Sequence, residues 1–444
     1  MKKRDFYLWL LLFFAAIFAC KDNGDDYVWE DYDPSKPVEL TSFYPDSGRI
    51  REKVILEGSN FGSDPEKIKV YFNKKRAAVI GSNGRRMYIV VPRVVNDICD
   101  VSVVVGNDSV VYDQKFRYKI TISVSTVAGD GTNAIRTGPL EQSQIAPFQL
   151  DVDQYDNIFV GTDNPASDAA SYSSAGLVRI NESENLMELV NKFPNVANSR
   201  FEGLCADKNT GILYTAVRTG TLEYAIIDPA NGWIPRYRTM TFKTGGAYPI
   251  PTANGNYMGY SSADKHMYTR YSTGQIVKIN PETGVAEIIF QSEEQGTSIG
   301  IDVDPTHPNM LYFAGYNSGT MAHGIWRLDL NDPEHSWTRL NTSKTSGHRD
   351  GPIEQALFNT PYGLKFDQDG ICYISDYNNY CIRKYDPSNG MVETVLGIPG
   401  VSGMQDGGKE EAKFSQPTAV GIGMDGTVYI ADRANRRIRK LSIE

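Results

Sequence analysis

The sequence has few of the residues that build disulfide frameworks, metal centres and compact catalytic sites. Its 444 residues include five cysteines and five histidines. The cysteines form no CxxC pair and lack metal-ligand spacing, which excludes the common zinc and redox motifs. No HExxH or GxSxG motif is present, so no compact metalloprotease or hydrolase signature exists. We therefore expect no metal and no cofactor.

Cys372 and Cys381 flank an expected hairpin turn at residues 376–379. A two-residue turn would place Cys381 opposite Ile374 and Cys372 diagonal to it, about 7 Å away or more at the backbone. A disulfide across that distance would be strained. We expect buried free thiols.

The sequence also lacks an apolar run long enough to cross a membrane. Residues 6–18 form an apolar run of 13 residues, preceded by Lys2, Lys3 and Arg4. A bilayer-spanning helix needs about 20 apolar residues. A basic start followed by a short apolar run is typical of a secretory signal, which we assign to residues 1–19.

Residues 17–20 (IFAC) resemble a bacterial lipobox, in which the cysteine becomes the lipidated N-terminus. The resemblance implies that Cys20 is the lipidation site and that the chain meets the membrane through this anchor only. The acidic tract at residues 21–26, within an expected tether over 20–36, resembles the export signal of Bacteroides-type surface lipoproteins. It implies an outer-membrane protein that faces the outside of the cell.

Basic residues are in the minority. The formal net charge is −9, and it becomes −11 once residues 1–19 are removed. Nucleic-acid binders carry a basic footprint that neutralises phosphates. The composition argues against a nucleic-acid partner and leaves glycans and peptides open.

Residues 37–120 contain short β-type runs separated by turn residues, as in a small β-sandwich. The expected strands are at residues 54–56, 68–72, 87–91 and 101–105. Four pieces of this segment resemble, in order and spacing, an IPT/TIG immunoglobulin-like domain: residues 43–48, 54–62, 70–73 and 89–92. The resemblance implies a spacer or binding module without a catalytic site.

Residues 121–444 repeat internally. Residues 356–384 and 412–440 align almost position for position at a spacing of 56. Their shared pattern, F-x-x-P followed by D-G-x-x-Y-I-x-D-x-x-N-x-x-I-R-K, resembles NHL repeats, and it implies that each copy is a four-stranded propeller blade. Weaker copies begin near residues 147, 202, 253 and 299, which predicts six blades.

The predicted fold is therefore all-β, with a β-sandwich followed by a six-bladed propeller. The last copy lacks an outermost strand, and residues 124–129 supply a spare strand before the first copy. We expect this N-terminal strand to close the ring, which removes an open sheet edge.

Within the repeats, Asp376, Asn379, Asp432 and Asn435 are interpreted as turn residues. Arg383-Lys384 and Arg439-Lys440 are expected on exposed strands. The DxD spacings near residues 151–157 and 367–370 lack a full set of calcium ligands and fall at hairpin turns. His266, His323 and His348 come from three separate segments and could converge on a metal, as in the amidating lyases that share this repeat; we take them as ordinary surface or core residues.

Candidate ligand-binding residues come from apparent aromatic-rich insertions in blades two to four, at residues 224–237, 248–260, 268–271 and 316–337. Sugar rings stack on aromatic faces, and functional residues concentrate on loops of rigid scaffolds. The candidates are Trp233, Tyr260, Tyr316 and Trp337.

The leading interpretation is a carbohydrate-binding surface lipoprotein that captures polysaccharide or oligosaccharide for an outer-membrane glycan uptake system. An outer-membrane transporter and further lipoproteins are the expected protein partners. Two alternatives stay open: a propeller lyase or hydrolase that acts on polysaccharide, and a surface scaffold for protein–protein interaction.

Overall fold

The computed structural model describes residues 29–94, 98–163, 176–192, 201–217, 223–251, 255–316 and 319–443. Cys20 and the acidic tract lie outside these residues. The chain divides into two compact units between Thr121 and Ile122. In the described part of the chain, no helix has both the length and the apolar character needed to cross a membrane.

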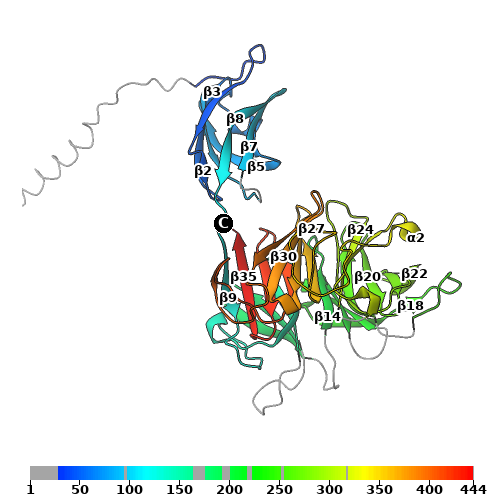
Figure 1. The fold of residues 1–444 in the computed structure, drawn as a ribbon. Coiled ribbons are helices and arrows are strands. Elements are labelled where there is room, and N and C mark those ends of the chain that lie inside the picture. The colour runs from blue at the N-terminus through cyan, green and yellow to red at the C-terminus, as the bar shows by residue number, and fades with distance from the viewer. Residues whose placement is uncertain are drawn as a thin grey trace, which may run out of the picture. The chain divides into compact units, whose positions relative to one another are not determined.

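The first unit is a small β-sandwich (Figure 1). Its eight strands are β1 (Glu39–Tyr44), β2 (Ser47–Gly48), β3 (Lys53–Ser59), β4 (Ile68–Phe72), β5 (Lys75–Ser82), β6 (Arg86–Val90), β7 (Ile98–Val105) and β8 (Asp108–Tyr118). The hydrogen-bonded order is β1-β3-β6-β5-β4-β7-β8-β2, so β5 links the two layers by pairing with both β6 and β4. The four strands expected from sequence are confirmed as β3, β4, β6 and β7.

Alternation along the strands builds the core of this unit. In β3, Val54 and Leu56 are fully buried while their neighbours Lys53 and Ile55 are exposed. From the facing layer, Phe72 and Phe116 meet edge to face at 5.1 Å between ring centroids. The period of two is what a sheet with one solvated face requires.

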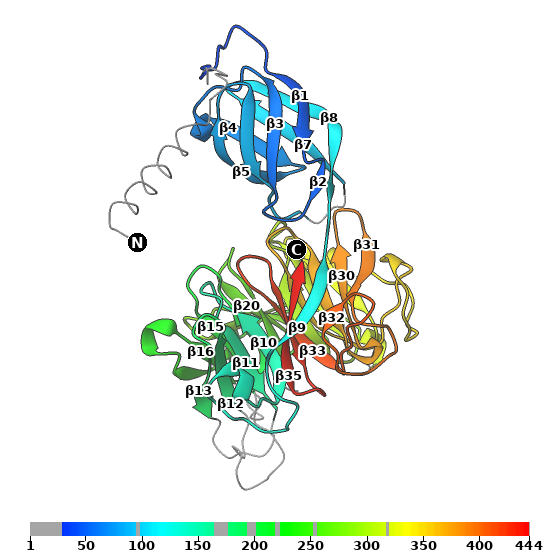
Figure 2. The same ribbon diagram turned by 90° about the vertical axis from the view of Figure 1, so that its left-hand side faces the viewer.

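The second unit consists of six sheets arranged as propeller blades, which confirms the predicted fold class (Figure 2). Their four main strands are antiparallel, and among the described strands of this unit only the edge strand of blade 3 pairs parallel. Blade 1 contains β10 (Pro147–Val152), β11 (Ile158–Thr162), β12 (Gly176–Asn181) and β13 (Leu186–Lys192). Blade 2 contains β14 (Phe201–Ala206), β15 (Leu213–Val217), β16 (Glu223–Ile227) and β17 (Pro235–Thr239). Blade 3 contains β19 (Gly255–Ser261), β20 (His266–Tyr271), β21 (Gln275–Ile279) and β22 (Val285–Gln291), with β18 (Thr241–Phe242) at its edge.

The remaining three blades have the same four-stranded plan. Blade 4 contains β23 (Ser298–Val303), β24 (Met310–Gly315), β25 (Ile325–Asp329) and β26 (Thr338–Arg339), with the short helix α2 (Pro333–Ser336) before its last strand. Blade 5 contains β28 (Pro361–Phe366), β29 (Cys372–Asp376), β30 (Cys381–Asp386) and β31 (Met391–Leu396), with β27 (Gly351–Pro352) at its edge. Blade 6 contains β33 (Pro417–Ile422), β34 (Val428–Asp432), β35 (Arg437–Ile443) and β9 (Ile122–Ala128), with β32 (Gly407–Gly408) at its edge.

Strand β9 closes the ring, as expected. It pairs antiparallel with β35, so that Val124 faces Leu441 and Thr126 faces Arg439. Figure 1 shows this cyan strand beside the red C-terminal strand. The first strands of all six blades pack against one another in a closed circuit, in which β10 meets both β14 and β33. These strands are buried on both sides, and β10 and β33 carry no exposed residue.

Blades 5 and 6 share a buried polar network built around one arginine each, which we call the arginine lock. In blade 5, Arg383 donates to Asp376 Oδ2 at 2.9 Å and to Asp350 Oδ1 at 2.7 Å. In blade 6, Arg439 donates to Asp432 Oδ2 at 2.8 Å and to Asp406 Oδ1 at 2.6 Å. Both arginines are 0% exposed, so the prediction that they lie on exposed strands is wrong.

The burial of these arginines follows from their carboxylate partners. Asp376 also accepts a hydrogen bond from the Asn379 amide, and Asp432 accepts one from the Asn435 amide, each at 2.8 Å. The repeated Asp and Asn side chains therefore bond to each other across the turn and hold the arginine. Asp376 makes no side-chain hydrogen bond that caps the turn, so the prediction that it caps the hairpin is wrong. Buried charges are stable only when paired and fully hydrogen-bonded, a condition that each lock meets.

The hairpin between β29 and β30 differs from the predicted register. Its turn is the 3₁₀ segment η5 (Tyr377–Asn379) followed by Tyr380 at φ 56°. This longer turn places Cys381 opposite Asp376 and Cys372 opposite Tyr385. Both thiols are free and buried, as expected, but they lie at opposite ends of the strand pair.

Two of the predicted insertions are regular blade strands. Residues 224–237 run through β16, the 3₁₀ segment η3 (Pro229–Asn231) and into β17, and residues 268–271 lie inside β20. Their aromatic side chains mostly fill the space between sheets, because a blade buries both faces. Tyr224, Tyr268 and Tyr271 are all 0% exposed.

Candidate functional site at the mouth of the propeller axis

Four half-buried or buried polar and aromatic residues follow the second strand of four consecutive blades. Each is the first residue after that strand, and the four are Tyr316 in blade 4, Tyr377 in blade 5, Arg433 in blade 6 and Asp163 in blade 1. We call this set the mouth arc. Second strands run antiparallel to first strands, so the arc lies at the end of the propeller where the first strands begin.

The residues of the mouth arc contact one another around the ring. The Arg433 Nε donates to Asp163 Oδ2 at 2.6 Å, and its Nη1 donates to the Tyr377 hydroxyl at 3.4 Å. Tyr377 stacks on Tyr362 with ring centroids 5.2 Å apart, and Tyr316 meets the same ring edge to face at 5.6 Å. Loops from four separate blades thus form one continuous surface.

Beneath the arc, three aromatic rings from alternate blades meet across the axis. Phe148 is the second residue of β10 in blade 1, Tyr257 lies in β19 of blade 3, and Tyr362 is the second residue of β28 in blade 5. Tyr362 lies 5.9 Å from Phe148 and 6.5 Å from Tyr257 between ring centroids. The three residues, which we call the aromatic layer, are between 1% and 6% exposed. These rings form an apolar layer of buried side chains below the arc.

The two guanidinium groups at the arc, those of Arg433 and Arg436, differ in how well a nearby carboxylate stabilises their charge. Burial opposes the charge on Arg433, but the Asp163 carboxylate raises the pKa of that guanidinium overall. Arg436, three residues further along the same loop, has its pKa lowered by burial and by the charge of Arg433. Burial also raises the pKa of the Tyr377 hydroxyl, so Tyr377 is neutral and can donate a hydrogen bond. The arc therefore offers guanidinium groups and hydroxyls beside aromatic faces.

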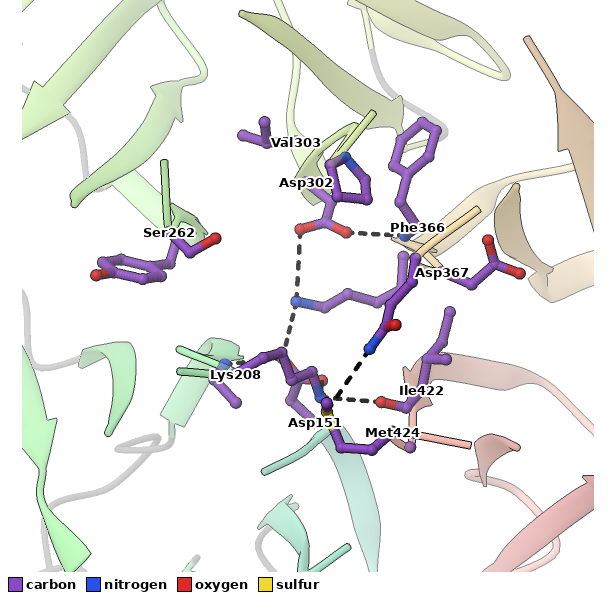
Figure 3. Close-up of a pocket in the computed structure, with 15 residues that line it drawn as sticks. Asp151, Lys208, Ser262, Asp302, Val303, Phe366, Asp367, Ile422 and Met424 are labelled. Atoms are coloured by element: carbon purple, nitrogen blue, oxygen red, sulfur yellow. Dashed lines mark hydrogen bonds and ion pairs between the residues drawn. The ribbon is translucent and has the colours of Figure 1, made fainter. Parts of the chain in front are cut away.

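The opposite end of the axis holds a buried group of charges, which Figure 3 shows. Lys365 lies between Asp151 at 2.9 Å and Asp302 at 3.8 Å. Lys208 lies 3.7 Å from Asp151 and donates to the carbonyls of Val152 and Ile422. We call these four residues the ionic cluster. Blades 1, 2, 4 and 5 each contribute one of them.

The ionic cluster is electrically balanced. Burial alone would favour neutral Lys365, but Asp151 and Asp302 raise its pKa overall. Burial also opposes the charge on Asp151, yet Lys365 and Lys208 lower its pKa; Asp302 lies further from Lys365, and there burial raises the pKa. A cavity of about 120 Å³ adjoins the cluster. Small-molecule sites occupy roughly 300–1,000 Å³, so this cavity suits water rather than a sugar.

Blade 6 leaves room for this cluster. Gly421 occupies the position that Lys365 holds in blade 5, as the pairing of Gly421 with Tyr429 and of Lys365 with Tyr373 shows. A Cβ atom on Gly421 would lie 2.5 Å from Leu150 Cδ1 and 3.1 Å from the Asp151 Cα, so a larger residue would force Leu150 to move. We interpret the ionic cluster as the closure of this end of the axis.

The structure does not bring the four aromatic candidates together. Tyr316 belongs to the mouth arc, whereas Tyr260 borders the cavity at the ionic cluster and stacks on Tyr214 at 4.6 Å. Trp233 packs 5.9 Å from Phe159 under the Arg179 guanidinium. Trp337 stacks on Trp326 at 5.0 Å and donates from Nε1 to Glu294 at 2.7 Å.

The described residues contain no cluster of three metal-ligating side chains. Each histidine has a local role instead. His266 lies beside Asp264, His323 Nδ1 accepts from the Thr360 backbone N–H at 3.0 Å, and His348 contacts Thr394 at 2.7 Å. The aspartates of the DxD segments cap hairpin turns, as predicted: Asp153 and Asp367 each accept two backbone N–H groups.

Sequence reasoning missed Tyr377, Arg433 and Asp163. A signal was present in the two aligned repeats, where Tyr377 and Arg433 occupy the same position beside the identical pairs Asp376/Asp432 and Asn379/Asn435. A position that differs inside an otherwise matching stretch is not needed for the repeat fold. Asp163 had no such signal, because blade 1 departs from the pattern.

The comparisons with known proteins agree with this architecture. Residues 37–118 match the model of the IPT/TIG domain. A 177-residue stretch, 36% of this chain, is 37% identical to NHL repeat-containing protein 2 from Bos taurus and covers 24% of it. The chain spans between 9% and 24% of the length of such curated relatives.

Two solved structures share the fold over nearly the whole chain. A protein of unknown function from Bacteroides thetaiotaomicron superposes with a TM-score of 0.79 and 25% identity, over 94% of this chain and 100% of that one. An auxiliary nutrient binding protein from the same organism gives a TM-score of 0.57 at 22% identity, over 93% and 99%. The chain thus consists of an IPT/TIG domain followed by a six-bladed β-propeller with homology to NHL repeats.

Proposed function

We propose that this protein is a lipid-anchored surface protein that binds a nutrient, and that the nutrient is a carbohydrate held at the mouth arc. The observation that carries the proposal is the arc itself, in which two half-buried tyrosines lie next to an arginine–aspartate pair. Four consecutive blades contribute to it, and the rigid ring fixes their spacing.

The chemistry of the arc suits a sugar. The apolar faces of pyranose rings stack on aromatic side chains, while the hydroxyls need donors and acceptors at the edge. Tyr316 and Tyr377 supply the faces, and Arg433 and Asp163 supply a donor and an acceptor. The aromatic layer beneath excludes water from one side of the site, which strengthens these hydrogen bonds.

The biological setting rests on other features. The lipobox at Cys20 and the acidic tract after it favour an anchor in the outer membrane and display outside the cell. The fold is shared with a protein named as an auxiliary nutrient binding protein, which agrees with capture rather than catalysis. In this role the protein would work beside an outer-membrane transporter and partner lipoproteins.

The test uses soluble protein that lacks residues 1–20, in affinity electrophoresis against plant, host and microbial polysaccharides. We expect one polymer class to retard the protein, and we expect Tyr377→Ala and Tyr316→Ala to abolish the retardation. Tyr155→Ala is the matched control, because Tyr155 is 63% exposed on the hairpin between β10 and β11, at the opposite end of the blade.

The same panel tests the other candidates. Trp233→Ala, Tyr260→Ala and Trp337→Ala should lower stability and leave retardation intact, because these side chains pack inside or between blades. Retardation lost in one of them, with an unchanged melting temperature, would move the site there. New reducing ends or unsaturated products would show that the protein cleaves the polymer, and would overturn the proposal of a binding protein without enzymatic activity. No retardation by any polymer would overturn carbohydrate capture.

A further inference from the structure

The loop between β34 and β35 brings a second guanidinium to the mouth arc. Arg436 adopts φ 54°, a left-handed conformation that is strained for any residue except glycine, asparagine and aspartate. Its Nη1 is buried and has no hydrogen-bond partner among the described residues. A buried guanidinium N–H without a partner is costly, and such groups normally have a water or a ligand.

Arg433 and Arg436 depend on the same carboxylate. Asp163 favours the charged form of both, and the charge of Arg433 disfavours that of Arg436. Asp163 is bound directly by Arg433 at 2.6 Å, so it is not free to pair fully with Arg436. Asp432, the residue before Arg433, is bound by Arg439 at 2.8 Å in the arginine lock. Arg436 therefore has donor capacity that the described side chains leave unused.

The repeat alignment shows that this pair is not part of the blade scaffold. The positions of Arg433 and Arg436 in blade 6 are held by Tyr377 and Tyr380 in blade 5. Tyr380 adopts φ 56°, almost the same backbone conformation as Arg436. The loop thus keeps its shape with tyrosine at both positions. By contrast, the structural arginines Arg383 and Arg439 recur in both blades with the same partners.

We propose that the ligand of the mouth arc is a saccharide that carries carboxylate groups, such as a uronic-acid polymer, with Arg436 as its carboxylate-binding residue. This inference rests on the proposed function. The planar guanidinium matches a carboxylate with two parallel hydrogen bonds, a geometry that a lysine cannot reproduce. The Arg433–Tyr377 contact places the stacking face next to the arginine pair. An acidic protein thereby holds a local site for an anionic sugar.

The decisive probe is a pair of polymers that differ only in charge. Polygalacturonate and its fully methyl-esterified form have the same backbone, but the ester has no free carboxylate. We expect the soluble protein to bind polygalacturonate on the order of tenfold more tightly than the ester, because the ester cannot form the hydrogen bond between the guanidinium and a charged carboxylate. Binding should also weaken as salt is raised.

Variants assign the preference to a residue. Arg436→Gln should lose the preference, and Arg436→Lys should restore part of it, because lysine keeps the charge but not the fork. Arg236→Gln is the matched control: it removes the same charge from an exposed position on β17, the outermost strand of blade 2. Circular dichroism and melting temperature confirm that each variant folds.

Two results would overturn the inference and leave carbohydrate capture standing. These are equal binding of the acid and the ester, or a preference that Arg436→Gln does not change. A second readout separates the two proposals. Free galacturonate at millimolar concentration should raise the melting temperature of the protein and not of Arg436→Gln, whereas galactose should raise neither. If galacturonate raises the melting temperature but no polymer retards the protein, the carboxylate site is supported and polymer capture is overturned.

Discussion

Blades 5 and 6 differ from blades 1 to 4 in how each is held together. In blades 5 and 6, a fully buried arginine on the third strand joins two carboxylates and two backbone carbonyls. The strand register places Val178, Ala225, Val277 and Trp326 at the corresponding position of the other four blades. The same backbone is thus compatible with a polar lock and with an apolar contact.

Blade 4 shows what replaces the lock. Trp326 occupies the arginine position, stacks on Trp337 and lies 5.6 Å below the Arg339 guanidinium. An aromatic stack tolerates sequence change more readily than a network in which every donor needs an acceptor. This difference shows that the conspicuous residues of the repeat pattern are those that form the arginine lock. Blades without the lock lack these residues and still adopt the four-stranded fold.

Breaking the lock should have the largest effect. Arg439→Met leaves Asp432 and Asp406 without their cation, and removing one partner of a buried ion pair costs about 3–5 kcal/mol. We expect urea denaturation of the soluble protein to show a loss of that size. Lys440→Met, on the next residue, removes a partly exposed pair with Glu182 and should cost less than about 1 kcal/mol. Equal losses would show that the lock is not special.

Removing the tryptophan stack that takes the place of the lock in blade 4 should lower the free energy of unfolding by a smaller amount. Trp337→Ala deletes a half-buried indole and its hydrogen bond to Glu294, so we expect a loss of about 2 kcal/mol in the same measurement. Because the stack is mainly apolar, this loss should change little with salt. A larger loss than that of Arg439→Met would reverse the order of the two kinds of blade.

Acid should weaken blade 5 through His348. Burial, and then the Arg383 charge, lowers the pKa of His348 in the folded protein. The unfolded chain therefore binds the proton more tightly, so this contribution to stability is present above the ordinary pKa of 6.5 and is lost as pH falls through the folded value. Between about pH 7.5 and pH 5.5, His348→Gln should lose less stability than the parent protein. An identical loss in both would contradict this role.

The smallest effect concerns the thiols. Cys205, Cys372 and Cys381 are free thiols, and Cys99 is buried like them; burial raises the pKa of the Cys205 thiol to about 12. A thiol reagent should find no reactive cysteine among these four in the folded soluble protein and all four in denaturant. A reducing agent should leave the melting temperature unchanged. A shift on reduction would reveal a disulfide that is absent from the described part of the chain.

Much of the fold followed from sequence because its signals are local. The turn residues of the sandwich, the repeat spacing and the spare strand at residues 124–129 each report backbone geometry within a few positions. The burial of Arg383 was not predictable in this way. Its partner Asp350 lies 33 positions away. Asp350 and Asp406 share the repeat spacing of 56, but that spacing does not show which side chain each carboxylate contacts, and only the closed network makes a buried charge stable.

The candidate site was harder to predict for a related reason. The aromatic count directed attention to tryptophans, yet in a blade packed on both faces a large ring is the normal filling of the core. Trp233 and Trp337 looked exposed because polar residues surround them in sequence. The mouth arc depends instead on one residue from each of four blades, and only the ring brings Tyr316, Tyr377, Arg433 and Asp163 together.

The closing strand β9 also limits the order in which the propeller can fold. Val124 is made early in synthesis, but its partner Leu441 comes from the far end of the propeller sequence. Loop closure over such a separation is slow, and until then the first strand and the sixth blade both present unpaired edges. The ring can therefore be completed only after the last blade has been synthesised. Pairing of β9 with β35 is then the last step in the folding of the propeller. A chaperone that covers open strand edges would be needed most in that interval.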